Sequence, residues 1–299
     1  MGMTASRLKP AAPRRAPTVD RARRYAGGGL RYLVLAAVNA LSLLPFLWVI
    51  LSSLKSHEEL YSKHLTFWPH RWTWDNYTQM FERMVGFGLY HRNSVLVSLG
   101  TVVLTLFTGS LAAYALSRFR FRGDRALLLL FLGTMMVPGE VGLIGQYELL
   151  SAYRLLNTLT GLTLSYSAFS LALTIFIMHS VFTGVPQELL DAARVDGCSW
   201  WEGFWQIMVP MGASGLAAAG TLVFLNSWNE FIFALTMNNW SDEARTLPVG
   251  IQLLQGQWQH WDYGVLFSSV MLSFVPVIIL FLLLQKYFMR GLTAGAVKG

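Results

Sequence analysis

The ionisable and amide side chains inside the long apolar stretches of this sequence are few and fall into two groups. Glu140 follows Pro138-Gly139, a pair that favours a break in a helix. Asn226, Asn229 and Glu230 lie together near the end of another apolar stretch. Because an isolated charge at membrane depth is costly, both groups are candidates for the lining of a wet solute path. The alternative is a structural polar contact, or, for Glu230, a side chain that reaches the membrane interface.

Patterns for catalysis and metal binding are missing from the sequence. The single cysteine, Cys198, excludes an internal disulfide and a multi-cysteine metal site, and we expect it to be a small packed residue. His179 is the only histidine within an apolar stretch, and no partner lies near it in the sequence. No lysine follows a glycine, so the phosphate-binding loop G-x-x-x-x-G-K-[ST] is absent. We therefore predict that this chain is not an enzyme and holds no metal or cofactor of its own.

The composition predicts an integral membrane protein. Of the 299 residues, 54% are hydrophobic and 13% are charged, whereas about a quarter are charged in a soluble domain. Crossing roughly 30 Å of hydrocarbon takes about 20 helical residues, and no stretch has the alternating pattern of a membrane β-barrel. We therefore predict an all-α integral membrane protein with six transmembrane helices. These spans are roughly Tyr32–Leu54, Asn93–Ser117, Ala126–Tyr147, Leu155–Phe182, Ile207–Phe233 and Tyr263–Gln285.

The basic residues predict the orientation of these spans. If the amino terminus is cytoplasmic, the inner segments hold 16 of the 23 Lys and Arg residues, four of them in the short loop Arg118–Arg125. This bias follows the positive-inside rule, so we expect a multi-pass protein of a bacterial plasma (inner) membrane with both termini cytoplasmic. The net charge of +7 then mainly reflects the basic residues that set the orientation of the spans. A nucleic-acid partner, which needs basic residues clustered on a soluble face, is not expected.

Three parts of the chain follow from this organisation. Residues 1–31 are predicted to form a basic cytoplasmic tail that is disordered, and residues 32–290 to hold the six spans. Residues 291–299 are predicted to form a cytoplasmic carboxyl tail. Contact of the basic tail with anionic lipid or RNA is the less favoured alternative.

A charged segment, Glu188–Pro210, separates the fourth span from the fifth. Pro186 and Glu188 are typical of the first turn of a helix, which should run through Val195. This helix should end near Gly197, because glycine readily takes the left-handed conformation found at helix ends.

A second helix should follow directly. Ser199 and Glu202 have the spacing of a capping box, so a helix should start there and continue to about Met208. Pro210 then marks the entry to the fifth span. The segment is thus predicted to be a helix-turn-helix on the cytoplasmic side of the membrane.

The first of these helices has a face suited to a protein partner. Leu189, Ala192, Ala193 and Asp196 share one side at spacings of three and four residues. Small side chains at the centre of this face would let another backbone come close, as when a helix lies in a partner's groove. The alternative is an amphipathic helix resting on lipid. Four acidic residues and one basic residue in the segment give it the wrong charge for an anionic membrane surface.

At this point the residues resemble a known family. Asp191-Ala192-Ala193, then Asp196-Gly197, then Ile207 and Pro210, are similar to the "EAA" signature of the permease subunits of binding-protein-dependent ABC importers. Two positions depart from the usual pattern, because Asp191 stands where glutamate is commonest and Cys198 where alanine is. Both differences keep either charge or size.

The resemblance covers nearly the whole chain from about residue 30. The stretches "NSVLVSLGTVVLTLFTGSLAAYALSRFRFRG", "NSWNEFIFAL", "TLPVGIQ" and "QKYFMRGLTAGAVKG" resemble the carbohydrate-uptake branch, and within it the second, maltose-type permease. The closing residues Gly295, Ala296, Val297, Lys298 and Gly299 are the most specific of these matches.

The resemblance implies a set of partners and contact residues. ATP and Mg²⁺ would be held by a separate ATPase dimer, a second permease subunit would complete a heterodimer in the lipid membrane, and an extracytoplasmic binding protein would deliver the solute. The loop Thr236 to Asp262 would probe that binding protein, and the tail Gly295–Gly299 would reach the ATPase interface. The residues that would couple to the ATPase are Glu188, Asp191, Ala192, Ala193, Arg194, Asp196, Gly197, Ile207 and Pro210.

The function that the resemblance implies is ATP-driven import of a sugar or oligosaccharide by alternating access. Glu140, Asn226, Asn229 and Glu230 are the candidates for its translocation path. A permease for a non-sugar solute such as glycerol phosphate is the first alternative. An ion-coupled secondary transporter is less favoured, because it would need coupling-ion residues within the spans and usually internal repeats.

Overall fold

The protein is described by a computed structural model that covers residues 18–238, 240–258 and 262–296. This part of the chain is helical apart from turns, loops and one isolated bridge between Lys55 and Trp72. Its helices, 3-10 turns (η1, η3) and π turn (η2) are α1 (Thr18–Ser53), α2 (His57–Leu60), α3 (Asp75–Arg83), α4 (Phe87–Arg118), α5 (Asp124–Thr134), η1 (Gly139–Gly142), α6 (Leu143–Ala152), α7 (Leu159–Thr183), α8 (Gln187–Val195), α9 (Trp200–Gly203), η2 (Phe204–Met208), α10 (Val209–Met211), α11 (Ala213–Asn229), α12 (Ile232–Met237), η3 (Asp242–Ala244), α13 (Leu247–Trp258) and α14 (Tyr263–Ala296).

By length and composition, the described residues hold four straight candidate membrane spans, or six if each of two bent helix pairs counts as one span. The bent candidates are helix pairs, Asp124–Thr134 with Gly139–Ala152 at 94° and Trp200–Met211 with Ala213–Asn229 at 78°. The all-α membrane fold predicted from the sequence is therefore confirmed, with two spans interrupted. The straight candidates are Arg31–Ser53, Phe87–Arg118, Leu159–Thr183 and Tyr263–Tyr287.

The third predicted span, Ala126–Tyr147, is not one straight helix. α5 ends at Thr134, and after η1 the chain continues as α6 in a direction turned by 94°. Pro138 lacks the backbone N–H that a continuing helix needs, and Gly139 follows it with little preference for helix. The 11 residues of α5 rise about 16 Å, roughly half of the hydrocarbon thickness.

The fifth predicted span, Ile207–Phe233, is also divided. α11 covers only Ala213–Asn229, because the chain bends at Gly212 and becomes extended at Glu230 (φ −66°, ψ 130°). A Cβ atom at Gly212 would lie 2.7 Å from Cε1 of Phe182, so this bend against α7 requires glycine.

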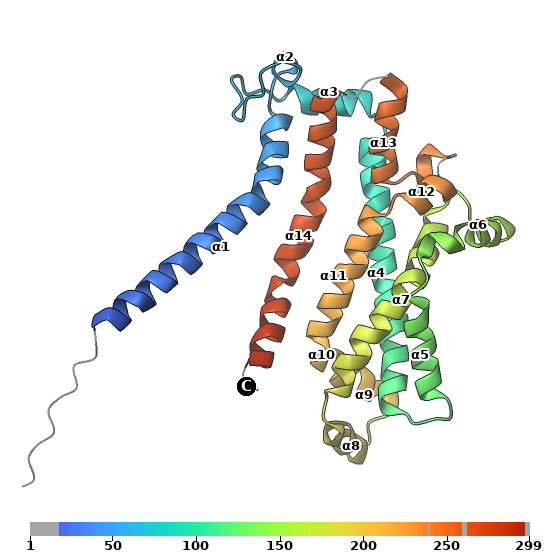
Figure 1. The fold of residues 1–299 in the computed structure, drawn as a ribbon. Coiled ribbons are helices and arrows are strands. Elements are labelled where there is room, and N and C mark those ends of the chain that lie inside the picture. The colour runs from blue at the N-terminus through green and yellow to red at the C-terminus, as the bar shows by residue number, and fades with distance from the viewer. Residues whose placement is uncertain (1–17, 239, 259–261, 297–299) are drawn as a thin grey trace, which may run out of the picture.

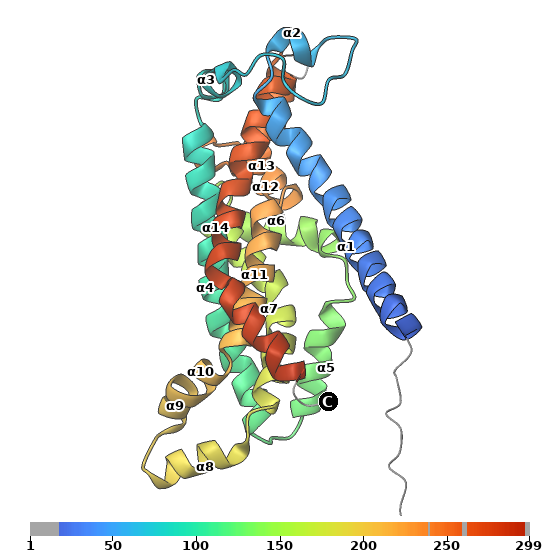
Figure 2. The ribbon, with the colours of Figure 1, turned by 90° about the vertical axis from the view of Figure 1, so that its left-hand side faces the viewer.

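The core of the bundle is formed by α4, α7 and α11, which lie side by side in both views (Figures 1 and 2). Small and hydroxyl-bearing residues allow α4 and α7 to approach closely. A Cβ atom at Gly109 of α4 would lie 2.7 Å from Cγ2 of Thr174 on α7, and Gly100 meets Thr163 in the same way at 3.2 Å. α14 packs against α11, whereas α5 packs mainly against α7 and has no buried residue.

α1 diverges from the rest of the bundle toward its amino-terminal end (Figure 1). Most of its side chains from Tyr32 to Phe46 are exposed, and it meets α14 where the rings of Phe46 and Phe274 lie 5.7 Å apart. The basic tail 1–31 was predicted to be disordered, but residues 18–31 continue α1 as helix, because Pro17 is the last proline before the span. Residues 1–17 lie outside the described part. At the other terminus, α14 stays helical to Ala296, so much of the predicted tail 291–299 is helix.

The short helices α2 and α3 lie across one end of the bundle, here called the α3 end (Figure 1). Asn76 of α3 donates through Nδ2 to the backbone carbonyls of Ser53 (2.9 Å) and Lys55 (2.7 Å) at the end of α1. Arg83 forms an ion pair with Asp262, directly before α14. These contacts fix the α3 end of α1 and α14, and the opposite end of the bundle carries α8 and α9.

Candidate functional site

The helix-turn-helix predicted between the fourth and fifth spans is confirmed. α8 ends at Val195, and Gly197 follows in the left-handed conformation with φ of +91°. Ser199 and Glu202 form the expected capping box, in which the backbone N–H of Ser199 donates to Glu202 at 2.7 Å and that of Glu202 donates to Ser199 at 3.2 Å. The second helix continues through the π turn to Met208.

One side of this segment is anchored in the bundle. Leu190 is 1% exposed and packs in a cluster with Phe204 and Met208 from the second helix and Phe182 from α7. The hydroxyl of Tyr114 on α4 donates to the carbonyl of Trp200 at 3.1 Å. Both halves of the segment therefore share one buried cluster with α4 and α7.

The other side of α8 is open. Leu189 and Val195 are aliphatic side chains that are 44% and 88% exposed. Of the residues predicted to couple to an ATPase, Ala193 is half-buried, Arg194 lies 3.8 Å over the ring of Trp200, and Ile207 is half-buried beside the Leu190 cluster. The remaining ones, all exposed, are Glu188, Asp191, Ala192, Asp196, Gly197 and Pro210. We call the exposed side of α8, with Glu188, Leu189, Asp191, Ala192 and Val195, the α8 surface.

Arg118, at the end of α4, holds this surface in place and was missed by sequence reasoning. Its guanidinium donates to the carbonyls of Phe182 (2.5 Å) and Val185 (2.7 Å) and to the side chain of Gln187 (2.8 Å). An arginine next to a predicted cytoplasmic loop is explained by the positive-inside rule alone. Nothing in the sequence therefore distinguished Arg118 from Arg120 or Arg122.

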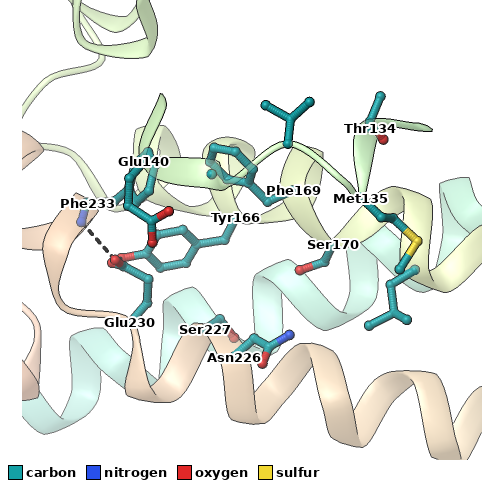
Figure 3. A pocket seen from close by; sticks show the side chains of 13 residues that line it. Thr134, Met135, Glu140, Tyr166, Phe169, Ser170, Asn226, Ser227, Glu230 and Phe233 are labelled. Carbon is teal, nitrogen blue, oxygen red and sulfur yellow. Dashed lines mark hydrogen bonds between the residues drawn. The ribbon is translucent and has the colours of Figure 1, made fainter. Parts of the chain in front are cut away.

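A cavity of about 370 Å³ lies between the break after α5, the middle of α7 and the end of α11. It brings together three of the four residues predicted to line a solute path, namely Glu140, Asn226 and Glu230 (Figure 3). Asn229 is not part of it. Its amide donates to the carbonyl of Leu225 at 2.9 Å, and it lines a smaller cavity of about 190 Å³ beside α13 and α14.

Glu230 is fully engaged at the junction of α11 and α12. Its carboxylate accepts the backbone N–H groups of Phe233 (2.8 Å) and Ala234 (3.0 Å), and it accepts a hydrogen bond from the hydroxyl of Tyr166. The first two bonds cap the amino-terminal turn of α12. Glu230 therefore makes the structural polar contact that was the alternative interpretation of this residue, and it also lies in the cavity wall.

Glu140 and the hydroxyl side chains complete the polar part of the wall. Glu140 is exposed and points toward Tyr166 from the side opposite α11 (Figure 3). Ser170 and Ser227 lie beyond Tyr166, and the ring of Phe169 supplies an apolar face. Sequence reasoning missed Tyr166 and Ser170, although their spacing of four residues within one span places both on one helix face.

The remaining predictions about sites concern metals and the carboxyl tail. Gly295 and Ala296 lie in the last turn of α14, while Val297, Lys298 and Gly299 fall outside the described residues. Among the residues that the structure describes, no group of three or more His, Cys, Asp or Glu side chains could hold a metal ion.

Comparison with known proteins places this architecture in a family. Residues 105–294 match the family model described as the binding-protein-dependent transport system inner membrane component. A sulfoquinovosyl glycerol transport system permease protein of Agrobacterium fabrum is 36% identical over 92% of this chain and 95% of its own length. An arabinooligosaccharides transport system permease protein of Bacillus subtilis is 36% identical over 88% of this chain and 92% of its own.

A solved structure has the same fold. It belongs to a bacterial ABC transporter involved in the import of the acidic polysaccharide alginate, and it superposes with a TM-score of 0.77 at 22% sequence identity. The match covers 94% of this chain and 100% of that one. The family model, the two relatives and the bent-span bundle agree, and the chain belongs to the family of inner membrane permease components of binding-protein-dependent ABC transport systems.

Proposed function

We propose that this chain is one of two transmembrane permease subunits of an ATP-driven importer that moves a neutral sugar or oligosaccharide by alternating access. The observation that carries the substrate class is the lining of the 370 Å³ cavity. Its wall offers two carboxylates, an amide, and serine, threonine and tyrosine hydroxyls next to phenylalanine rings. Such a set matches the hydroxyl groups and apolar faces of a sugar.

The charge of this wall supports a neutral solute. No lysine, arginine or histidine is among the residues that line the cavity, whereas Glu140 and Glu230 are. An anionic solute such as glycerol phosphate, the first alternative, would meet two like charges and no cation. The two relatives are named for the transport of sulfoquinovosyl glycerol and of arabinooligosaccharides, and the solved structure comes from an importer of the acidic polysaccharide alginate. The lining of this chain favours a neutral saccharide over an acidic one.

The α8 surface is the proposed contact with the ATPase. It joins exposed aliphatic side chains, Leu189 and Val195, to the acidic residues Glu188 and Asp191. In this proposal the α8 end, both termini and the ATPase dimer with its ATP and Mg²⁺ are cytoplasmic, in agreement with the positive-inside bias. A solute-binding protein delivers the sugar at the α3 end, where the loop Thr236 to Asp262 contains the end of α12 together with η3 and α13.

The test starts from the intact complex. A tagged copy of the chain is purified from its native host, the co-purifying subunits are identified by mass spectrometry, and the complex is reconstituted into liposomes with its binding protein. ATP-dependent uptake is then measured for labelled neutral oligosaccharides, for oligosaccharides that carry uronic acids, and for glycerol phosphate. We expect uptake of a neutral saccharide only. Uptake of glycerol phosphate, or uptake driven by an ion gradient without ATP, would contradict the proposal.

A further inference from the structure

A second cavity, of about 390 Å³, lies at the α8 end of the bundle, where the loop between α4 and α5 passes α7. The residues that line it include two arginines, Arg120 and Arg125, and one histidine, His179. We call this the basic pocket. It is separate from the sugar cavity, and neither the proposed transport function nor the α8 surface uses it.

The charges of the basic pocket are not neutralised by the protein. In the part of the chain that the structure describes, the ion pairs are Arg83 with Asp262 and Arg245 with Asp242, and neither involves this pocket. The one carboxylate in the lining, Asp124, accepts the backbone N–H of Arg125 at 2.6 Å. One acidic group therefore faces two arginines, which leaves a site that attracts an anion.

The other half of the pocket is apolar. Leu116, Phe119 and Leu128 line it together with the basic groups. Above it, along α5, Leu129 and Leu130 are 66% and 64% exposed, on a helix that buries none of its residues. Basic groups beside apolar side chains, next to a helix with exposed leucines, match the two-part chemistry of a phospholipid, whose headgroup is anionic and whose acyl chains are apolar.

The depth of the pocket agrees with this occupant. The candidate spans of α4 and α7 end at Arg118 and Thr183, and the part of the lining that these two helices and the residues just after α4 supply lies within four positions of those ends. The pocket is therefore at the level where lipid headgroups meet the hydrocarbon region. A soluble phosphate compound would use the arginines but would gain nothing from the apolar half.

We propose that the basic pocket binds the phosphate group of an anionic phospholipid through Arg120 and Arg125, with the acyl chains lying along α5. Guanidinium groups bind phosphate oxygens in pairs of charge-assisted hydrogen bonds. The assignment to the inner leaflet rests on the orientation given under the proposed function, whereas phosphate binding does not. A bound lipid would stabilise α5, a helix that has no buried residue and whose last residue, Thr134, lines the sugar cavity.

The test uses the full chain in its purified complex. The complex is stripped of lipid with detergent and then supplied separately with phosphatidylglycerol, phosphatidylcholine, inorganic phosphate or glycerol phosphate. Retained lipid is counted by native mass spectrometry, and the Tm is measured by a thermal-shift assay. We expect wild type to retain phosphatidylglycerol and to gain thermal stability from it alone. For R120Q/R125Q we expect retention to fall by roughly ten- to thirty-fold, the effect of losing two basic contacts to an anionic headgroup.

Two control variants make the result specific. R122Q removes an arginine of the same loop that does not line the pocket, and it should retain phosphatidylglycerol as wild type does. R120K/R125K keeps the charge, so partial retention is expected while the fold is preserved. Equal retention by R120Q/R125Q and R122Q would overturn the proposal. Stabilisation by inorganic phosphate to the same extent as by phosphatidylglycerol would overturn the lipid as the source of the phosphate.

One further outcome concerns a protein partner. If R120Q/R125Q lost the second permease subunit while its lipid retention stayed unchanged, the pocket would be a protein contact and the proposal would be overturned. Because lipid retention is measured without transport, a failure here leaves the proposed sugar import untouched. A failure of sugar uptake equally leaves the lipid result standing.

Discussion

Nη1 of Arg118, the last residue of α4, donates a hydrogen bond to Oε1 of Gln187, the first residue of α8, over 2.8 Å. The amide nitrogen of Gln187 in turn donates to Asp191 at 3.0 Å. A single arginine thus connects the end of a core helix to an acidic residue of the α8 surface.

Replacing Arg118 should loosen this connection. We expect Arg118→Gln to lower uptake per ATP hydrolysed several-fold, because three hydrogen bonds from one guanidinium hold α8 against α4 and α7. Loss of such charge-assisted bonds costs about 2 kcal/mol, which corresponds to a Tm lower by roughly 5 °C. Uptake and ATPase rates are measured in the same liposomes. Arg122→Gln, in the following loop, is the matched control, and equal coupling in both variants would contradict the role of Arg118.

The turn between the two helices depends on a left-handed glycine. Gly197→Ala should cost about 1–2 kcal/mol, because φ is +91° there and a Cβ atom would meet nothing within 4 Å, so strain is the whole effect. We expect coupling to fall while the complex still assembles. Gly123→Ala is the matched control, since Gly123 has φ of +97° and equally open space but lies outside the coupling segment. Similar losses of coupling in both variants would show that the strain acts on stability alone.

We expect that α8 does not tolerate a large side chain in place of one of its alanines. We predict that Ala193→Trp reduces sugar uptake about ten-fold or more and uncouples ATP hydrolysis, because an indole would hold the partner backbone away from α8. Ala152→Trp, at the exposed end of α6, is the matched control and should leave uptake unchanged. Normal uptake by Ala193→Trp, with normal association of the ATPase, would exclude α8 as the coupling contact.

The two glutamates of the sugar cavity should behave differently. Glu140→Gln should lower uptake several-fold with no change in Tm, because Glu140 is exposed and caps no helix that the structure shows. Glu230→Gln should lower the Tm as well, because it weakens the bonds from Tyr166 and from the first turn of α12. Tyr166→Phe removes one of these bonds and keeps the ring. An unchanged uptake rate for Glu140→Gln would remove that residue from the proposed translocation path.

The α3 end offers a test of packing that is independent of transport. A Cβ atom at Gly264 would lie 2.2 Å from Oδ1 of Asn76, which is 4% exposed and bonded to two carbonyls of the α1 end. We expect Gly264→Ala to destabilise the protein by about 1–3 kcal/mol, seen as a lower Tm. Gly88→Ala, in the first turn of α4 with nothing within 4 Å of its Cβ, should keep the wild-type Tm or raise it slightly. A wild-type Tm for Gly264→Ala would contradict the close contact with Asn76.

The turn and the helix cap between the fourth and fifth spans were easier to predict from the sequence than the bends within the spans. Gly197 and the Ser199–Glu202 capping box specify the helix-turn-helix through their own backbone preferences, so sequence alone was sufficient. The break after Thr134 could be suspected from Pro138-Gly139, but the 94° turn depends on how α5 and α6 pack. The bend at Gly212 depends on Phe182, 30 residues away in the chain, whose ring leaves no room for a side chain.

The candidate site shows the same division. Glu140 and Glu230 stood out because charges in apolar stretches are rare, and the structure brings them to one cavity. Tyr166 carries no charge and reads as an ordinary aromatic residue of a span, so only its position beside Glu230 reveals its part in the wall. Asn229 lies three residues from Asn226 on α11, but its amide bonds back to the carbonyl of Leu225 and it lines a different cavity, a difference that the spacing alone does not predict.

The shortness of α5 also bears on how the protein enters the membrane. A helix of 11 residues with no buried side chain is well below the 17 or so residues that a segment needs to cross the bilayer independently. α5 therefore has to be inserted together with a neighbour. Only the five-residue loop Phe119–Gly123 separates α4 from α5, so the two form a helical hairpin. In this hairpin the long helix α4 can insert together with the short helix α5. We therefore expect α5 to reach its final depth only after α7 has emerged during synthesis, because α7 supplies the surface against which α5 packs.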